Sequence, residues 1–194
     1  RFRMPNPLEN GQGLIFMKVG LHASESLEDI VRRKRREFEE AGSIFWGYGG
    51  SSCHPRTMVQ PFGKSMQEEG KHLLIIMNEM NSKHAAPPVA ATHYSEDGVD
   101  WEAVPKGIEV RGSRFALVLD ELRLDEFEVN LNDFEVGLGQ SRGKVASEYL
   151  KGQNDKGCLI YHEPHVPPPP EERIVKRIGL IARVKPPFAV FLKN

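Results

Sequence analysis

The stretch SLEDIVRRKRREFEEAGSIFW, residues 26–46, decides the class of fold because it predicts an amphipathic helix that runs directly into a strand. Ser26 and Asp29 have the spacing of an N-terminal capping box, and Gly42 occupies the usual position after a helix C-terminus. The apolar residues recur at helical spacing on one face: Leu27, Ile30, Val31, Phe38 and Ala41. Residues 44–46 form an apolar run that predicts a strand. We therefore expect one long amphipathic helix near the N-terminus, packed on a sheet.

The rest of the chain is predicted to be mostly β-structure. Residues 72–78 are almost continuously apolar, which indicates a central strand buried on both faces. Residues 127–131 and 134–138 alternate between apolar and polar side chains around Asn132 and Asp133, which predicts a two-residue hairpin turn. Further strands are expected at 14–19, 89–94, 107–110, 115–119, 158–161, 174–184 and 188–192, and short helices at 56–69 and 144–150.

These elements predict an α+β fold: a mixed, largely antiparallel sheet with one long helix and one or two short helices. The length of 194 residues fits a single compact domain over residues 1–194. Four consecutive prolines in the loop 166–172 prevent this loop from joining the interior of a sheet. We expect the loop to precede a C-terminal hairpin.

The composition is that of an ordinary globular protein, with 39% hydrophobic and 27% charged residues and a net charge of −1. A near-neutral charge argues against a surface built as a whole for nucleic acid, which is usually basic. The longest apolar run, residues 73–77, is far shorter than the roughly 20 residues of a membrane-spanning helix. Two cysteines, Cys53 and Cys158, give no disulfide framework and suit a reducing compartment. We therefore expect a cytoplasmic protein without a membrane partner.

Five consecutive basic residues, 32–36, resemble a nucleic-acid-binding patch at first sight. Consecutive helical residues are about 100° apart, so these side chains point around the helix instead of along one stripe. Acidic partners stand at helical spacing: Glu28–Arg32, Asp29–Arg33, Arg33–Glu37, Arg35–Glu39 and Arg36–Glu40. The pairs predict a solvated helix that neutralises its own charge, with a basic contact surface as the alternative.

The segment IFWGYGGSSCHP, residues 44–55, is the first candidate binding site. An apolar strand runs into glycines and serines, a pattern that lets backbone amides and hydroxyls converge on a phosphate group. The residues expected to contact a ligand are Trp46, Tyr48, Gly49, Gly50, Ser51, Ser52 and Arg56. The two aromatic rings would stack on a base, and the arginine would supply positive charge. The alternative is a sharp turn that ends a buried strand, with both rings in the core.

The segment FEVGLGQSRGKVASEYL, residues 134–150, has the same layout of a strand, glycines and a helix. Its spacing is not that of a nucleotide-hydrolysing P-loop, because three residues separate Gly139 from Gly143 and Val145 follows Lys144. Anion binding is still expected at the start of the helix. The expected contacts are Gly139, Ser141, Arg142 and Lys144. The alternative is a glycine-rich turn whose basic residues face water.

Cys53 and His54 invite a catalytic or metal-site interpretation. Adjacent residues of an extended chain point in opposite directions, so the two are not expected to act as a pair. His162 and His165 flank Pro164, which removes the helical geometry that zinc motifs of the HExxH type use. We therefore predict no metal site, and the sequence identifies no cofactor.

Two short segments, HAS (22–24) and HYS (93–95), place a histidine two residues before a hydroxyl. The pattern resembles the paired H-x-[ST] motifs of the two-histidine phosphoesterases, and the resemblance covers six residues. It implies a hydrolase in which His22 and His93 act as general acid and base while the two serines hold the phosphate. A glutamate follows each motif here, where that family has an apolar residue. Residues 95–98 also fit a hairpin turn.

Three functions stay open on the sequence alone. The first is a binding protein that recognises the phosphate of a nucleotide or nucleic acid through the two glycine-rich segments. The second is a hydrolase that uses His22 and His93. The third is a protein-interaction or assembly subunit whose contact surface includes the loop 166–172 and the hairpin after it. No motif decides whether the chain is an enzyme.

Overall fold

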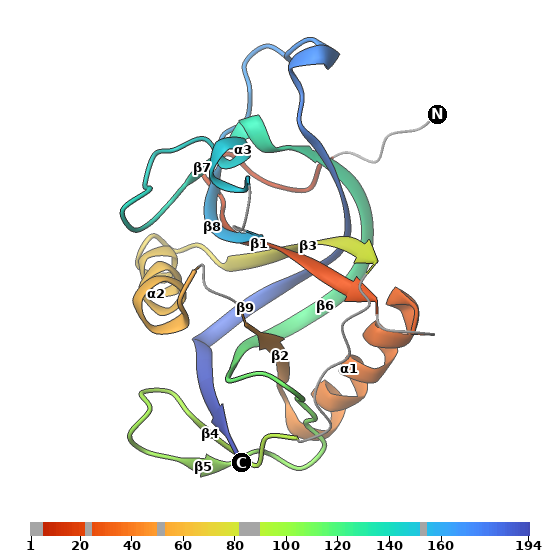
Figure 1. Ribbon diagram of the computed structural model, residues 1–194, viewed down its shortest axis with the longest axis vertical. Coiled ribbons are helices and arrows are strands. Elements are labelled where there is room, and N and C mark those ends of the chain that lie inside the picture. The colour runs from red at the N-terminus through yellow and green to blue at the C-terminus, as the bar shows by residue number, and fades with distance from the viewer. Residues whose placement is uncertain (1–5, 22–24, 50–52, 82–89, 152–154) are drawn as a thin grey trace.

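The computed structural model describes residues 6–21, 25–49, 53–81, 90–151 and 155–194 (Figure 1). The strands are β1 (Gly13–Leu21), β2 (Ile44–Tyr48), β3 (Leu73–Asn81), β4 (His93–Ser95), β5 (Glu102–Ala103), β6 (Phe115–Asn130), β7 (Phe134–Val136), β8 (Lys156–Tyr161) and β9 (Val175–Lys193). They form one sheet in the order β2-β6-β9-β3-β1-β8-β7, and β4 pairs with both β5 and β9. Among the described strands β1 and β3 run parallel, while the other pairs run antiparallel. The mixed sheet agrees with the predicted α+β class.

The helix near the N-terminus, α1 (Leu27–Ala41), begins and ends at the predicted residues. The Ser26 hydroxyl accepts a hydrogen bond from the Asp29 amide at 3.2 Å, and the Ser26 amide donates to the Asp29 carboxylate at 3.1 Å. Gly42 takes a left-handed conformation with a φ of 74°, and its amide donates to the Phe38 carbonyl at 2.8 Å. The prediction of a long helix is corrected: α1 has 15 residues, an ordinary length for a globular protein.

The other helical elements are short: η1 (Pro55–Val59), α2 (Gln60–Glu68), η2 (Leu131–Asp133), α3 (Ala146–Tyr149) and η3 (Pro170–Glu172). α2 continues directly from η1 and lies against β9, where Gly63 meets the Phe188 ring and leaves no room for a Cβ atom. Both predicted short helices are therefore present, at 55–68 and at 146–149. No helix in the described part of the chain is long and apolar enough to cross a membrane.

The two longest strands, β6 and β9, correct the predicted C-terminal hairpin. Residues 174–184 and 188–192 belong almost entirely to one strand, β9, which pairs with β6 on both sides of Pro186 and Pro187. Residues 185–188 bulge out of this pairing, because Val184 pairs with Leu119 and the next β9 partner is Ala189. The prolines therefore interrupt the ladder without reversing the chain.

The predicted hairpin around Asn132 and Asp133 is also wrong. Both residues lie in η2, and β7 pairs with β8 instead of with the preceding β6. The Asn130 side-chain oxygen accepts a hydrogen bond from the Asn132 amide at 3.1 Å and another from the Ile174 amide at 3.0 Å. These bonds turn the chain away from β6, so that the alternating residues 134–136 reach the far edge of the sheet.

The core lies on both faces of the sheet. In β1, Ile15 and Met17 pack with residues of α1 and α2, whereas Leu14 and Phe16 pack with residues of β7 and α3 on the opposite face. The neighbouring β3 is the central strand predicted at 72–78: Leu73, Ile75 and Met77 are buried on one face, and Ile76 is buried on the other. This prediction is confirmed.

The basic run 32–36 is neutralised only in part, and by other partners than the sequence predicted. Arg32 forms an ion pair with Asp29 at 3.1 Å, and Arg33 forms one with Glu25 at 3.0 Å. None of the five predicted pairs is among the ion pairs of the described residues, and Arg35 donates instead to the Leu122 carbonyl at 3.4 Å. Lys34 differs from its neighbours because it points inward and is only 5% exposed.

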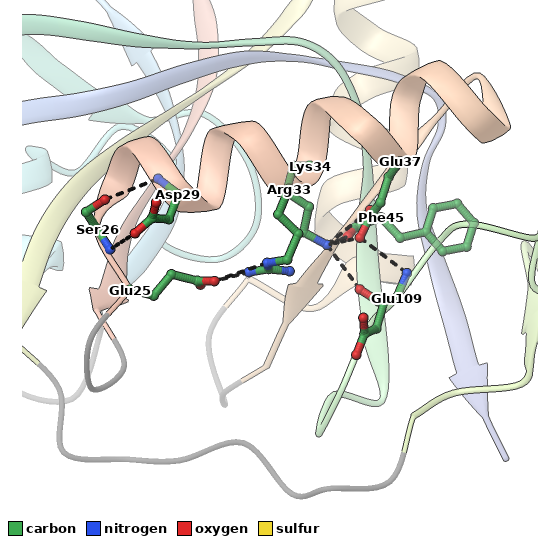
Figure 2. A network of polar contacts seen from close by, with 8 residues as sticks. All are labelled: Glu25, Ser26, Asp29, Arg33, Lys34, Glu37, Phe45 and Glu109. Carbon is green, nitrogen blue, oxygen red and sulfur yellow. Dashed lines mark hydrogen bonds and ion pairs between the residues drawn. The ribbon is translucent and has the colours of Figure 1, made fainter.

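Figure 2 shows how Lys34 joins α1 to the sheet. Its Nζ donates to both carboxylate oxygens of Glu37, at 3.0 and 3.2 Å, and to the carbonyl oxygens of Phe45 at 2.8 Å and Glu109 at 3.2 Å. The Glu37 carboxylate also accepts a hydrogen bond from the Glu109 amide at 3.2 Å. Both buried charges therefore have partners, and the network fixes α1 against β2 and the segment before β6.

Candidate functional site

The two glycine-rich segments meet at β8. The Gly137 amide donates to the Cys158 carbonyl at 2.9 Å, and the Cys53 sulfur lies 2.9 Å from the Cys158 sulfur. Gly139 faces Met58 of η1 so closely that a Cβ atom at Gly139 would lie 3.2 Å from the methionine Cε. The loop between β7 and α3 therefore packs beside η1.

A pair of thiols lies at this meeting point. Cys53 belongs to the bend before η1, whereas Cys158 is in the middle of β8, and their side chains are 1% and 0% exposed. Cys53 has a φ of 58°, in the left-handed region that non-glycine residues seldom adopt. The Tyr48 hydroxyl donates a hydrogen bond to the Cys53 carbonyl, which holds the bend against the end of β2. The backbone strain and this bond together direct the Cys53 sulfur toward β8.

Lys156 adds a buried positive charge beside the thiols. It stands at the start of β8 and is 5% exposed, with its Nζ 4.6 Å from the centre of the Tyr48 ring. That geometry is a cation–π contact. Burial lowers the pKa of Lys156 below its ordinary value of 10.5.

The thiols differ in acidity. Hydrogen bonding with Cys158 and with Tyr48, together with the nearby charge of Lys156, lowers the pKa of Cys53 below its ordinary value of 9.0 although the side chain is buried. The same sulfur–sulfur hydrogen bond and complete burial raise the pKa of Cys158 well above that value. Of the two thiols, Cys53 is the one with the lowered pKa, and the sulfur–sulfur hydrogen bond favours a single thiolate in the pair.

The predicted ligand residues of the first segment are divided between core and surface. Trp46 and Tyr48 are 8% and 1% exposed, so neither ring presents a face on which a base could stack, and the alternative placement in the core holds for both. Gly49 and Arg56 are exposed. The remaining predicted contacts, Gly50, Ser51 and Ser52, lie outside the described residues.

The second segment forms a closed loop. The amides of Arg142, Gly143 and Lys144 donate to the carbonyls of Gly139, Val136 and Ser141, at 3.2, 2.8 and 3.0 Å. These amides are engaged within the loop, so they are not available to surround an anion as a phosphate loop does. The side chains of Arg142 and Lys144 are exposed, and Ser141 is half-buried. Any anion contact here would come from these side chains.

Of the two histidine motifs, only residues 93–95 belong to the described part of the chain, because His22 and Ser24 lie outside it. His93 is exposed in β4, where its Nδ1 lies 2.8 Å from the Thr92 hydroxyl. Ser95 is buried in the turn predicted at 95–98: its hydroxyl donates to Asp97 at 3.0 Å and accepts from the Gly98 amide at 2.8 Å. This serine is therefore already occupied by turn contacts.

The metal-site alternatives do not converge. Cys53 is buried and His54 is exposed, in line with the expected divergence of adjacent side chains. His162 lies 2.9 Å from the Glu135 carboxylate on the surface. No group of three potential metal ligands is present among the described residues.

Two hollows lie away from these segments. One of about 480 Å³ is next to Asp120 and Arg183, whose bidentate ion pair has distances of 2.8 and 2.7 Å. The other, of about 690 Å³, lies between the start of α1 and the outer ends of β3 and β9. None of the predicted ligand residues that the structure describes lines either hollow.

Sequence reasoning missed the pairing of Cys53 with Cys158 and the position of Lys156. The two cysteines are 105 positions apart, and no local pattern links a bend after β2 to the middle of β8. Only the cysteine count was visible, and two cysteines without a motif do not predict contact.

Comparison of the chain with protein-family models, with curated proteins and with solved structures finds no match. The function has to be argued from the geometry of this chain.

Proposed function

We propose that this protein binds a phosphate-bearing ligand, a nucleotide or a nucleic acid, on the surface where the segments 47–56 and 137–144 adjoin. The observation that carries the proposal is the contact between the second segment and η1, which follows directly on the first segment. Gly139 of one lies against Met58, two residues beyond Arg56 of the other, although the segments are far apart in the sequence.

The proposed contacts are made by side chains. Arg56, Arg142 and Lys144 are exposed and positively charged, and the Ser141 hydroxyl is a further donor. Guanidinium and ammonium groups form strong, charge-assisted hydrogen bonds with phosphate oxygens. The closed hydrogen bonding of the loop 137–144 supports this mode over recognition by backbone amides. Because Trp46 is buried, recognition of a base would need other groups.

Thermal denaturation with phosphate-bearing probes tests the proposal. Inorganic phosphate, ATP and a single-stranded oligonucleotide are added separately to the full chain at low salt. A probe at about 100 times its dissociation constant stabilises the folded state by about 2.7 kcal/mol, which corresponds to a rise in Tm of about 5–10 °C. For the oligonucleotide, the shift should shrink steeply as salt increases, because backbone contacts release counterions.

A charge-reversal pair makes this test specific. Arg56→Glu combined with Lys144→Glu should abolish the shift, whereas Lys106→Glu combined with Arg114→Glu should keep it. The control changes the net charge equally at exposed residues outside both segments. The proposal fails if none of the probes raises Tm, or if the two double variants respond alike.

A second candidate function is supported by one observation. Along the proline-rich loop and the start of β9, Val166, Ile174 and Val175 are 79%, 47% and 46% exposed, and exposed apolar side chains favour a protein-contact surface. Size-exclusion chromatography at rising protein concentration tests self-association. A monomer mass that stays the same at every concentration would contradict self-assembly through this loop.

A further inference from the structure

The cysteine pair is the strongest feature that the proposed binding function does not use. The chain has two cysteines in all, and the fold brings them into contact from two separate elements. A sulfur–sulfur distance of 2.9 Å is close to the approach that thiol–disulfide exchange requires, since little further movement would join the atoms at the roughly 2.05 Å of a disulfide.

We propose that Cys53 and Cys158 are a redox-active dithiol that closes to an intramolecular disulfide on reaction with a low-molecular-weight disulfide. This activity is independent of the proposed phosphate-bearing ligand. It assigns the two cysteines distinct roles, with Cys53 as the attacking thiol and Cys158 as the resolving thiol.

The surroundings of the pair distinguish it from two cysteines that only fill the core. Buried cysteines commonly behave as small apolar side chains and need no charged neighbour. Here Lys156 is enclosed beside the thiols, and the negative groups that favour its charge are the neighbouring Asp155 carboxylate and the Cys53 thiolate. Loss of the Cys53 proton therefore places a negative charge next to a buried ammonium.

The backbone also favours Cys53 as the attacking residue. Its left-handed φ of 58° places it in a bend between β2 and η1, whereas Cys158 is held by the ladder of β8 against β1. A residue in a bend moves more easily than one in the middle of a sheet. The lower pKa of Cys53 agrees with this assignment because the thiolate is the nucleophile.

The reaction balances in two exchange steps. Because Cys53 is 1% exposed, the reaction begins with a local opening that brings its sulfur to the surface. The Cys53 thiolate then attacks one sulfur of the small disulfide RSSR, which gives a mixed disulfide at Cys53 and releases RS⁻. Cys158 then loses its proton and its sulfur attacks the Cys53 sulfur, which forms the Cys53–Cys158 bond and releases a second RS⁻. The two thiol protons of the protein end on the two RS⁻ ions. The protein is oxidised by two electrons, and one RSSR is reduced to two RSH.

Equilibration with glutathione tests the proposal directly. The full chain is incubated in a series of reduced and oxidised glutathione mixtures, quenched with acid, unfolded and alkylated, and its intact mass is measured. We expect wild-type protein to lose both alkylation sites together as the mixture becomes more oxidising, without an added glutathione. The idea is wrong if both cysteines are still alkylated in the most oxidising mixture, or if both carry glutathione.

Single variants identify the roles of the two thiols. Cys53→Ser and Cys158→Ser cannot close the bond, so each should stop at one mixed disulfide at most. We expect the mixed disulfide to form faster in Cys158→Ser, which retains Cys53, than in Cys53→Ser. The opposite order would overturn the assignment of Cys53 as the attacking thiol. The wild-type measurement decides whether the pair closes even if a variant does not fold.

Closure should also be visible in Tm. The bond would link residues 105 positions apart, and constraining a loop of that size in the unfolded state raises Tm by about 5–15 °C. The rise should disappear on reduction and be absent from both serine variants. Oxidation that leaves Tm unchanged or lowers it would contradict a bond that the native geometry accommodates.

Discussion

Lys34 and Lys156 are both 5% exposed, but the protein surrounds them in opposite ways. Lys34 has a carboxylate partner in Glu37 and donates to two backbone carbonyls, so each of its donors can be satisfied (Figure 2). Lys156 lies over the Tyr48 ring, near the Cys53 thiol and the Asp155 carboxylate, and it takes part in none of the ion pairs of the described residues. A buried charge with a full set of partners fixes a structure. A buried charge without a full set of partners acts on a neighbouring titratable group: here the Lys156 charge lowers the pKa of Cys53.

The largest expected effect is the loss of stability on replacing Lys34. Lys34→Met would leave the Glu37 carboxylate buried without its counter-ion, and breaking a buried pair in this way costs about 3–5 kcal/mol in the free energy of unfolding. Urea denaturation measures the loss. Lys151→Met is the matched control because Lys151 pairs with Glu148 at the same spacing but on the surface, where a loss of less than about 1 kcal/mol is expected.

The double variant Lys34→Met, Glu37→Leu separates the contribution of the charge pair from that of the carbonyl contacts of Lys34. Removing both charges takes away the unpaired carboxylate, so this protein should recover most of the stability that Lys34→Met loses. A double variant as unstable as the single one would mean that the carbonyl contacts of Lys34, and not its charge pairing, hold α1 in place.

The expected effect on the Lys156 side is smaller. Lys156→Met removes an ammonium that has no ion-pair partner among the described residues, so the free energy of unfolding at pH 7 should change by less than about 1 kcal/mol. The variant should react more slowly with oxidised glutathione, because the nearby charge favours the Cys53 thiolate. A loss as large as that of Lys34→Met would end the distinction between the two lysines.

The smallest expected effect is a pH dependence of stability. Burial lowers the pKa of Lys156 in the folded state below the 10.5 of the unfolded chain, so between these values the unfolded state binds more protons. Stability therefore rises with pH in this window. A group that takes up one whole proton on unfolding adds roughly 1.4 kcal/mol per pH unit to the free energy of unfolding. As pH rises toward 10.5, the free energy of unfolding of the wild-type protein should therefore increase by a fraction of this amount relative to that of Lys156→Met. Paired urea titrations at pH 8 and pH 10 measure this gain, and an equal response of both proteins would contradict it.

The sequence predicted those elements whose signals are local. The helix α1 follows from Ser26 at one end and Gly42 at the other, and both caps act within a few residues. The burial of β3 on both faces follows from its uninterrupted apolar residues. In contrast, the bulge that carries β9 past Pro186 depends on its partner β6, so the sequence alone suggested a turn.

The candidate site was predictable only in part for the same reason. Glycines and basic residues marked the two segments, but whether Trp46 faces the core or a ligand depends on what covers β2. The inward direction of Lys34 depends on Phe45 and Glu109, which are 11 and 75 positions away. Contacts at such separations are set by the packing of the sheet and leave no periodic pattern in the chain.

The edges of the sheet have a consequence for how this protein behaves among its own copies. At one edge, both backbone groups of Val136 are taken by the loop 137–144: its amide donates to Lys144 and its carbonyl accepts from Gly143, each at 2.8 Å. At the other edge, the Lys34 ammonium occupies the carbonyl of Phe45 in β2. Exposed strand edges recruit strands from other molecules and begin aggregation. The glycine-rich loop and the buried lysine thus each occupy backbone groups with which a strand of another molecule would otherwise pair.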